Sequence, residues 1–198
     1  MSSGEAGRAG TGVRSDCLVR ITKTDKGGVQ ITLQSKVDVL YGRANRMLLE
    51  QLAAFFTLEH VTIDVEDSGA LPYTIAARFE TAVRRLHGEA APWLPPPHSN
   101  EPVASTRDRF RRSRLYLPGN DPKLAINAGV HGADGLILDL EDSVAQTEKD
   151  AARILVRNTL HAVDFMGAER MVRINQLPLG LEDLDAVIPR KPDLILIP

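Results

Sequence analysis

The sequence has 198 residues, of which 43% are hydrophobic and 25% are charged, as is usual for folded globular domains. Its formal net charge of -2 at pH 7 provides no general attraction to nucleic acid or to anionic membranes. The single cysteine, Cys17, excludes an internal disulfide framework and a cysteine-based zinc site. No stretch is long and apolar enough to span a bilayer, and the N-terminal segment lacks the apolar core of a secretory signal. We therefore expect a cytoplasmic protein of one large or two small domains, without nucleic-acid or membrane partners.

Residues 9–87 are expected to form a small α+β domain. The β-branched segments Cys17–Thr22 and Val29–Gln34 flank a glycine turn, which predicts a β-hairpin. A helix with Asp38 as its candidate N-cap should follow. The apolar residues spaced for its buried face are Leu40, Ala44, Met47, Leu48, Leu52 and Phe55.

The rest of this half predicts a third strand over Val61–Val65 and a helix over residues 72–87. A strand over Leu71–Ala76 is the alternative for the start of that last segment. Residues 88–112 are rich in proline and small polar residues, which favours an extended linker. Its end is basic, and we interpret this run as a solvated approach to the next strand in preference to a phosphate-binding patch. The arginines of the run are Arg107, Arg109, Arg111, Arg112 and Arg114.

Residues 113–198 alternate short apolar runs with helical patterns, which predicts an α/β domain with a parallel sheet. The expected strands cover 113–117, 135–140, 170–174 and 193–197, and the expected helices cover about 121–130, 144–163 and 180–187. A complete (β/α)₈ barrel needs about 250 residues. We therefore expect either a small open sheet or the front third to half of such a barrel.

Acidic residues gather where the second of these strands ends, in the positions that line the active sites of parallel α/β folds. Asp139 and Glu141 are candidates for gripping an arginine, binding a hard cation or moving protons. For Asp142 we favour helix capping, by itself or with Ser143. The Pro118–Pro122 turn is a weak anion-binding signal, since the same residues make an ordinary turn.

Arg173 lies near the end of the third strand, where its guanidinium suits a substrate carboxylate or an ion pair with Asp139 or Glu141. Asn175 follows at the strand tip, where its amide could orient a substrate or turn the chain. Lys149 and Arg153 are interpreted as a solvated helix face. The five histidines show no metal-binding spacing, and His131 is expected to be structural.

Four ordered motifs in the second half resemble the citrate lyase β-subunit family, which belongs to the aldolase and citrate-lyase-like TIM barrels. These motifs are Arg112–Asn120, Gly132–Val144, Glu148–Arg153 and Val172–Asn175. The first half independently resembles the acyl carrier (γ) subunits of citrate lyase. The matching stretches there are Ala9–Thr11, Ser15–Asp16, Val19–Ile21 and Asp67–Leu71.

The resemblance implies an acyl carrier domain over residues 9–87, a Pro-rich linker over 88–112 and a partial lyase barrel over 113–198. The carrier would hold phosphoribosyl-dephospho-CoA, a phosphopantetheine-like group, covalently on a serine. The lyase would cleave a citryl thioester to an acetyl thioester and oxaloacetate with Mg²⁺. The implied partners are the α transferase subunit and a complete β lyase subunit. By this comparison Arg173 is the substrate-binding arginine, with Asp139 and Glu141 as the other candidate catalytic residues.

Two departures from the family pattern shape these expectations. Arg14 stands where the family has its modified serine, so either Ser15 accepts the group one residue along or the carrier is unmodified and Ser15 is a plain loop serine. The family's metal-binding glutamate and aspartate lie on later barrel strands, beyond Pro198, so we assign no metal ligand here and expect the chain alone to be an incomplete lyase. The alternatives are a non-catalytic carrier or assembly protein, and a lyase for another acyl-CoA such as malyl-CoA.

Overall fold

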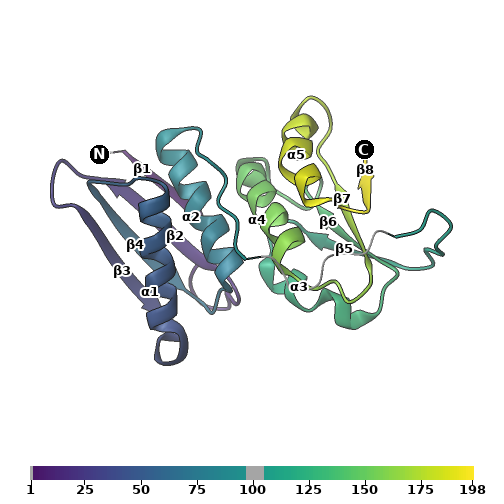
Figure 1. The fold of residues 1–198 in the computed structure, drawn as a ribbon, viewed down its shortest axis with the longest axis horizontal. Coiled ribbons are helices and arrows are strands. Elements are labelled where there is room, and N and C mark those ends of the chain that lie inside the picture. The colour runs from purple at the N-terminus through teal and green to yellow at the C-terminus, as the bar shows by residue number, and fades with distance from the viewer. Residues whose placement is uncertain (1, 97–104) are drawn as a thin grey trace. The chain divides into compact units, whose positions relative to one another are not determined.

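The computed structural model describes residues 2–96 and 105–198, and the chain divides into two compact units, residues 1–95 and 96–198. Each unit has its own four-stranded sheet and its own hydrophobic core (Figure 1). The fold is therefore mixed α/β, as predicted. The middle of the predicted linker, residues 97–104, lies outside the described residues. No helix in the described part of the chain is both long and apolar enough to cross a membrane.

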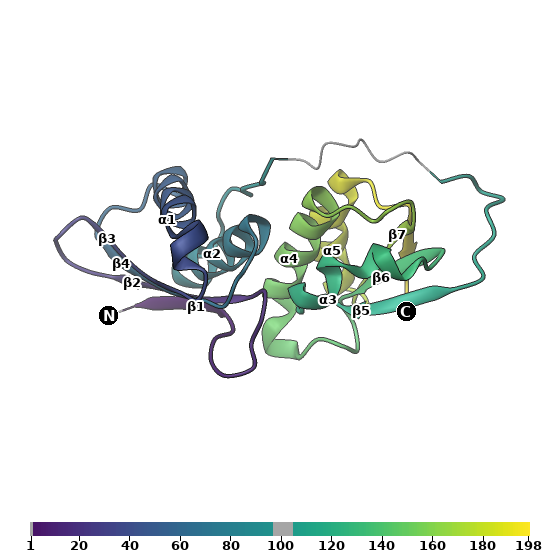
Figure 2. The same ribbon diagram turned by 90° about the horizontal axis from the view of Figure 1, so that it is seen from below.

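The first unit places two helices on one face of a mixed sheet with the strand order β1-β2-β4-β3 (Figure 2). β1 and β2 are antiparallel, as are β2 and β4, whereas β3 runs parallel to β4. In chain order the elements are β1 (Ser3–Gly7), β2 (Cys17–Lys23), β3 (Val29–Ser35), α1 (Asp38–Phe55), β4 (Val61–Asp67) and α2 (Pro72–His87).

The predicted hairpin is wrong, because the two strands form but do not pair with each other. β4 lies between them, with Val65 opposite both Val19 of β2 and Leu33 of β3. β4 buries every second residue, while β3 is half exposed along its length. The more apolar strand thus takes the central position, and α1 carries the chain back so that β3 and β4 can pair in parallel.

β1 lies before the predicted start of this domain at residue 9 and has little strand propensity of its own. Its small residues are explained by packing, because a side chain on Gly4 would come within 2.0 Å of the carbonyl oxygen of Ala82 in α2. Glycine at this position lets α2 lie close against β1.

The predicted first helix forms, but its predicted buried face is confirmed only in part, because Leu52 is buried and Leu48 packs against the core. Of the predicted core residues, Leu40, Met47 and Phe55 are 77%, 49% and 46% exposed. The buried face is rotated towards Asn45, which faces inward and donates a hydrogen bond of 3.2 Å to the buried carboxylate of Asp67. The residues that α1 buries are Gly42, Asn45, Leu49, Leu52 and Ala53. Asp38 is not the N-cap either, since it is the first residue of the helix and Val37 precedes it.

The predicted helix over residues 72–87 is confirmed as α2, and the alternative strand is excluded. Ile75, Phe79 and Val83 of its predicted apolar face are buried in the core of the unit. Pro72 at the first helical position has a backbone angle that suits a helix start.

The second unit confirms the predicted parallel sheet. Its strands β5 to β8 pair in chain order, and the described residues form an open sheet. The elements are β5 (Arg114–Pro118), α3 (Pro122–Ile126), β6 (Gly135–Asp139), α4 (Lys149–Ala162), β7 (Glu169–Arg173), α5 (Leu179–Val187) and β8 (Leu194–Leu196).

The basic run before β5 is not simply solvated. Arg111 donates two hydrogen bonds of 2.6 Å to the carboxylate of Glu169, whose side chain is fully buried at the start of β7. Burial would raise the pKa of Glu169, but the hydrogen bonds from Arg111 and Ser105 hold it below its usual value. Arg111 therefore ties the segment before the sheet to the amino end of β7.

The first unit should be sensitive to the loss of either partner of the buried ion pair between Asp16 and Arg78. Both side chains are buried, and Arg78 binds the two carboxylate oxygens at 2.9 and 3.0 Å. Asp16→Ala should lower the free energy of unfolding by about 3–5 kcal/mol, because it leaves a buried guanidinium without its carboxylate. Urea denaturation, followed by hydrogen exchange of β2 and α2 amides, measures this loss.

Glu5→Gln is the matched control. It removes the carboxylate from an ion pair with Arg20 in which both side chains are about half exposed. Such exposed pairs contribute roughly 0–1 kcal/mol, so this variant should unfold nearly as the parent does. Equal losses for the two variants would contradict the assignment.

Candidate functional site

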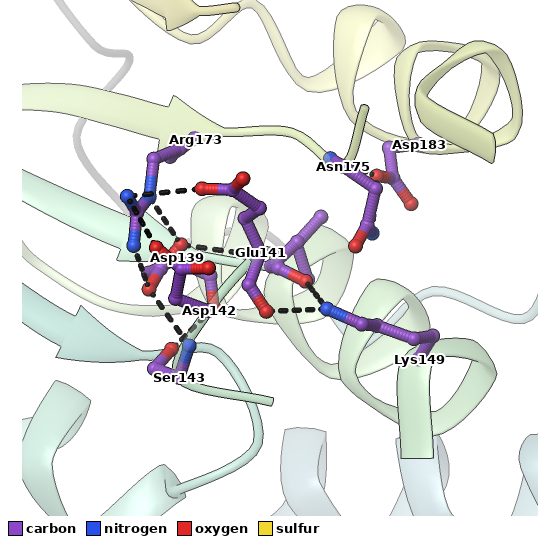
Figure 3. Close-up of polar contacts among 9 residues, drawn as sticks. Asp139, Glu141, Asp142, Ser143, Lys149, Arg173, Asn175 and Asp183 are labelled. Carbon is purple, nitrogen blue, oxygen red and sulfur yellow. Dashed lines mark hydrogen bonds and ion pairs between the residues drawn. The ribbon is translucent and has the colours of Figure 1, made fainter. Parts of the chain in front are cut away.

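The main candidate site lies at the carboxyl ends of β6 and β7 and in the loop before α4 (Figure 3). The parallel register places Asp139, the last residue of β6, directly beside Arg173, the last residue of β7. The sequence predicted these two residues from different strands, and the structure brings them into contact.

Arg173 binds Asp139 through two hydrogen bonds. Its Nε donates to Oδ1 at 2.7 Å and its Nη2 donates to Oδ2 at 2.8 Å. The Asp139 side chain is 3% exposed and that of Arg173 is 22% exposed, so only the arginine keeps an accessible edge. The hydrogen bond with Asp139 raises the pKa of Arg173, which therefore stays charged.

Asp139 also organises the loop that follows it. Its carboxylate accepts the backbone N–H groups of Glu141 at 2.9 Å and Ser143 at 3.2 Å. Burial would raise the pKa of Asp139, but the hydrogen bonds from Arg173, Ser143 and Glu141 prevail and lower it from 3.8 to about 2. The carboxylate is thus a permanent anion that holds both the arginine and the loop.

Two further carboxylates of the loop contact the remaining nitrogen of the arginine. Nη1 of Arg173 lies 3.0 Å from Glu141 and 3.3 Å from Asp142, whose side chain is 77% exposed. The ring of Tyr116 in β5 lies below the guanidinium, 5.3 Å from its central carbon. The predicted capping role of Asp142 or Ser143 is wrong, because α4 begins only at Lys149, after a 3₁₀ turn.

Lys149 is part of this site and not of a solvated face, contrary to the prediction. Its ammonium donates to the backbone carbonyl oxygens of Leu140, at 2.7 Å, and Glu141. The residue is 8% exposed, and burial lowers the pKa of the lysine although nearby carboxylates oppose that shift. Lys149 therefore holds the loop through its carbonyl groups, whereas Asp139 holds it through its N–H groups. The spacing of one helical turn between Lys149 and Arg153 had indicated a solvated face instead.

Arg153, which was predicted to lie on the same solvated face as Lys149, belongs instead to a second network of buried hydrogen bonds and ion pairs. It binds Asp183 of α5 at 2.7 Å, and the same carboxylate accepts two hydrogen bonds from Asn175, at 2.8 Å from the backbone and 2.7 Å from the side chain. Because the side-chain nitrogen of Asn175 donates to Asp183, the side-chain oxygen of the same amide points away from that carboxylate. Asp183 was not singled out from the sequence, since it lies between other acidic residues of the same helix, Glu182 and Asp185.

This arrangement can exchange one carboxylate for another. Arg173 is held by the buried Asp139, whereas Asp142 makes a longer contact from an exposed position. A substrate carboxylate can replace Asp142 on Nη1 without disturbing the buried pair.

The described residues do not fit a metal site of their own. No group of three or more histidine, cysteine, aspartate or glutamate side chains among them is arranged to hold a metal ion. Asp139, Glu141 and Asp142 all face the guanidinium of Arg173.

The second candidate site is Ser15, in the loop between β1 and β2. Its backbone lies in the left-handed region, with φ of 58°, and its N–H donates to the carbonyl oxygen of Ser68 at 3.0 Å. The next residue, Asp16, is anchored by the buried pair with Arg78. The backbone of Ser15 is therefore fixed from both sides.

The side chain of Ser15 is partly exposed, and its hydroxyl has no hydrogen bond within the described residues. The same loop borders an open groove of about 600 Å³, lined by residues 9–12, 34–36 and 66–68. An unengaged hydroxyl on a fixed backbone is compatible with a covalently attached group, and the groove itself is lined by other residues of the loop.

Two family models match the chain, one in each unit. Residues 112–198 match the HpcH/HpaI aldolase/citrate lyase family, and residues 5–86 match the malonate decarboxylase delta subunit family.

Curated relatives match the second unit. The chain is 42% identical over 93 residues to the citrate lyase subunit beta of Leuconostoc mesenteroides subsp. cremoris, and 39% identical over 94 residues to that of Escherichia coli K12. It is also 44% identical over 89 residues to a (3S)-malyl-CoA thioesterase of Cereibacter sphaeroides. These matches cover 46%, 46% and 44% of this chain and 31% of each relative, so the chain spans about a third of their length.

The depressed pKa of Asp139 predicts how the pair with Arg173 depends on pH. A carboxyl group with a lowered pKa stabilises the folded state above its ordinary pKa of 3.8, and this contribution is lost as the pH falls through about 2. Asp139→Asn should therefore be less stable than the parent at neutral pH, and the difference should shrink as the pH falls from about 4 to about 2.

Denaturant titrations at several pH values measure this difference. Asp142→Asn, which alters the exposed partner of Arg173, should follow the parent at every pH. A deficit of Asp139→Asn that stays constant down to pH 2 would count against the assignment.

Proposed function

Because the chain combines a segment of the HpcH/HpaI aldolase/citrate lyase family with one of the malonate decarboxylase delta subunit family, we propose that it is a citrate-lyase component. Its first unit would carry an acyl thioester, and its second unit would contribute to cleavage of a citryl thioester into an acetyl thioester and oxaloacetate. The observation that carries the proposal is the presence of both segments on one chain, since a carrier and the enzyme that acts on its cargo belong to the same process.

In the first unit, we assign attachment of phosphoribosyl-dephospho-CoA to Ser15. Its fixed backbone and unengaged hydroxyl support this assignment, although Arg14 stands at the position of the serine that carriers of this type modify. When bound, the group would supply the thiol that holds the acyl chain. The protein's own contribution is to hold that arm on the loop whose residues 9–12 border an open groove.

In the second unit, Arg173 would hold a carboxylate of the substrate. Asp139 keeps the guanidinium charged and in place, and Lys149 and Asp139 together fix the loop that bears Glu141 and Asp142. Cleavage of the carbon–carbon bond further needs a base for the substrate hydroxyl and a stabiliser for the developing enolate. In this family Mg²⁺ would be that stabiliser, but the described residues do not fit a metal site. We propose that an α transferase and a complete β lyase subunit are the partners.

The second candidate function is action on another acyl-CoA, such as a malyl thioester. The observation in its favour is the 44% identity to a (3S)-malyl-CoA thioesterase over 89 residues. The first unit weighs against it, because a free CoA thioester needs no carrier domain. A carrier or assembly role without catalysis is the remaining alternative, and it predicts attachment at Ser15 without substrate binding at Arg173.

The attachment is tested by the mass of the chain from a host that makes the prosthetic group. We expect the peptide that contains Ser15 to carry the mass of phosphoribosyl-dephospho-CoA, and Ser15→Ala to abolish the addition. Ser68→Ala is the matched control, because Ser68 contacts Ser15 only through its backbone carbonyl oxygen. An unmodified Ser15, or an addition that persists in Ser15→Ala, would refute the carrier role at this residue.

Substrate binding is tested by calorimetric titration of the full chain with citrate, oxaloacetate and malate. Arg173→Lys keeps the charge but cannot form bidentate hydrogen bonds with a carboxylate. The affinity for the acid should therefore fall about tenfold or more, equivalent to about 1.4 kcal/mol. Asp142→Asn should bind at least as tightly as the parent, because the substrate displaces that side chain. Unchanged affinity in a folded Arg173→Lys protein would remove this arginine from the site, and the preferred acid distinguishes citryl from malyl chemistry.

A further inference from the structure

Helix α1 carries an apolar stripe on its solvent side, in addition to the face that it buries. The stripe runs along the whole helix, and Leu40, Met47 and Phe55 are among the most exposed large apolar side chains of the first unit. The exposed apolar residues of the stripe are Leu40, Tyr41, Ala44, Met47, Ala54 and Phe55, and the partly buried Leu48, which also packs against the core, lies at its edge. A surface helix normally has one apolar face, so a second one marks a site of association.

The stripe has the spacing of a coiled-coil seam. Leu40, Ala44, Met47, Gln51 and Ala54 alternate steps of four and three residues, which keeps them on one side of the helix. The buried face of α1 points into the sheet and is not available for this contact.

The seam is complementary to itself when two copies of α1 run in opposite directions. If Ala44 lies opposite Met47 of a second copy, each small residue faces a large one at the centre of the pair. The same register places Tyr41 of one helix beside Leu48 of the other along one flank. A small side chain then packs against a large one at the centre of the contact, and towards each end Leu40 of one helix lies opposite Gln51 of the other.

Charge on the other flank supports the same register. Arg43 and Glu50 are exposed, and neither forms an ion pair with any described residue. In the antiparallel arrangement, Arg43 of each copy meets Glu50 of the other, which gives two symmetric ion pairs. In a parallel pair, Arg43 and Glu50 would instead lie beside Leu48 and Phe55 of the other helix, and no ion pair would form between the two flanks.

We propose that the chain self-associates through an antiparallel contact between the α1 helices of two copies. Such a contact is isologous, because the same surface serves both partners. The 18 residues of α1 span about 27 Å, so the contact is at the small end of specific interfaces and should be weak. The inference does not depend on the proposed function.

Sedimentation velocity of the full chain over a range of concentrations tests the proposal. We expect a reversible monomer–dimer equilibrium, and Met47→Glu should abolish it by placing two carboxylates at the centre of the seam. Leu181→Glu is the matched control, since Leu181 is an exposed apolar residue on another helix, and it should leave the equilibrium unchanged. A chain that stays monomeric at the highest soluble concentration would overturn the proposal and assign the stripe to a different occupant.

Charge reversal tests the register. Arg43→Glu and Glu50→Arg should each weaken dimerisation about tenfold or more, because like charges then meet across the contact. The double variant Arg43→Glu/Glu50→Arg should restore the affinity of the parent. Failure of the double variant to recover would exclude the antiparallel register.

A disulfide experiment gives an independent readout. The native Cys17 is fully buried, so a cysteine introduced on α1 reports without interference. A mixture of Ala44→Cys and Met47→Cys chains should oxidise preferentially to the mixed dimer. Preferential cross-linking of Ala44→Cys to itself would show parallel helices and overturn the proposal.

Discussion

The contact between Asp139 and Arg173 is the interaction on which the second unit's candidate site depends. It exists because parallel strands place their carboxyl ends at the same edge, and the register of β6 and β7 aligns the two residues. The buried carboxylate keeps the arginine charged and accepts two loop N–H groups, so one anion fixes both the arginine and the loop around it. Lys149 holds the same loop from its carbonyl side.

The first unit uses buried carboxylates in a similar way. Asp16 and its partner Arg78 anchor the end of the loop that carries Ser15. Asp67 accepts the N–H groups of Gly69 and Ala70 and the side chains of Ser35 and Asn45, and this last contact sets the rotation of α1. The exposed apolar stripe of α1 is a consequence of this rotation. The buried carboxylate of Asp67 needs hydrogen-bond donors, so the side of α1 that bears Asn45 faces the core and part of its more apolar side faces solvent.

Most of the second unit's fold was predictable because its strands are short apolar runs separated by helical patterns, a signal that is local in sequence. Asp139, Glu141 and Arg173 were predictable for the same reason, since the ends of such runs meet at one edge of a parallel sheet. Lys149 and Asp183 were not assigned to the site, because each acts through a contact with a residue 8 or 9 positions away in an adjoining loop or strand end. Periodicity along one helix cannot report such contacts.

The sequence by itself determined the two-part organisation, the α/β class, the parallel order of the second sheet and the polar residues at its carboxyl edge. These features follow from composition and from periodic patterns within single elements. Only the tertiary structure decided that β4 separates β2 from β3, which side of α1 faces the core, and which carboxylate holds Arg173 most firmly. Each of these is settled by competition between distant segments for one buried position, and that competition takes place only once the chain is packed.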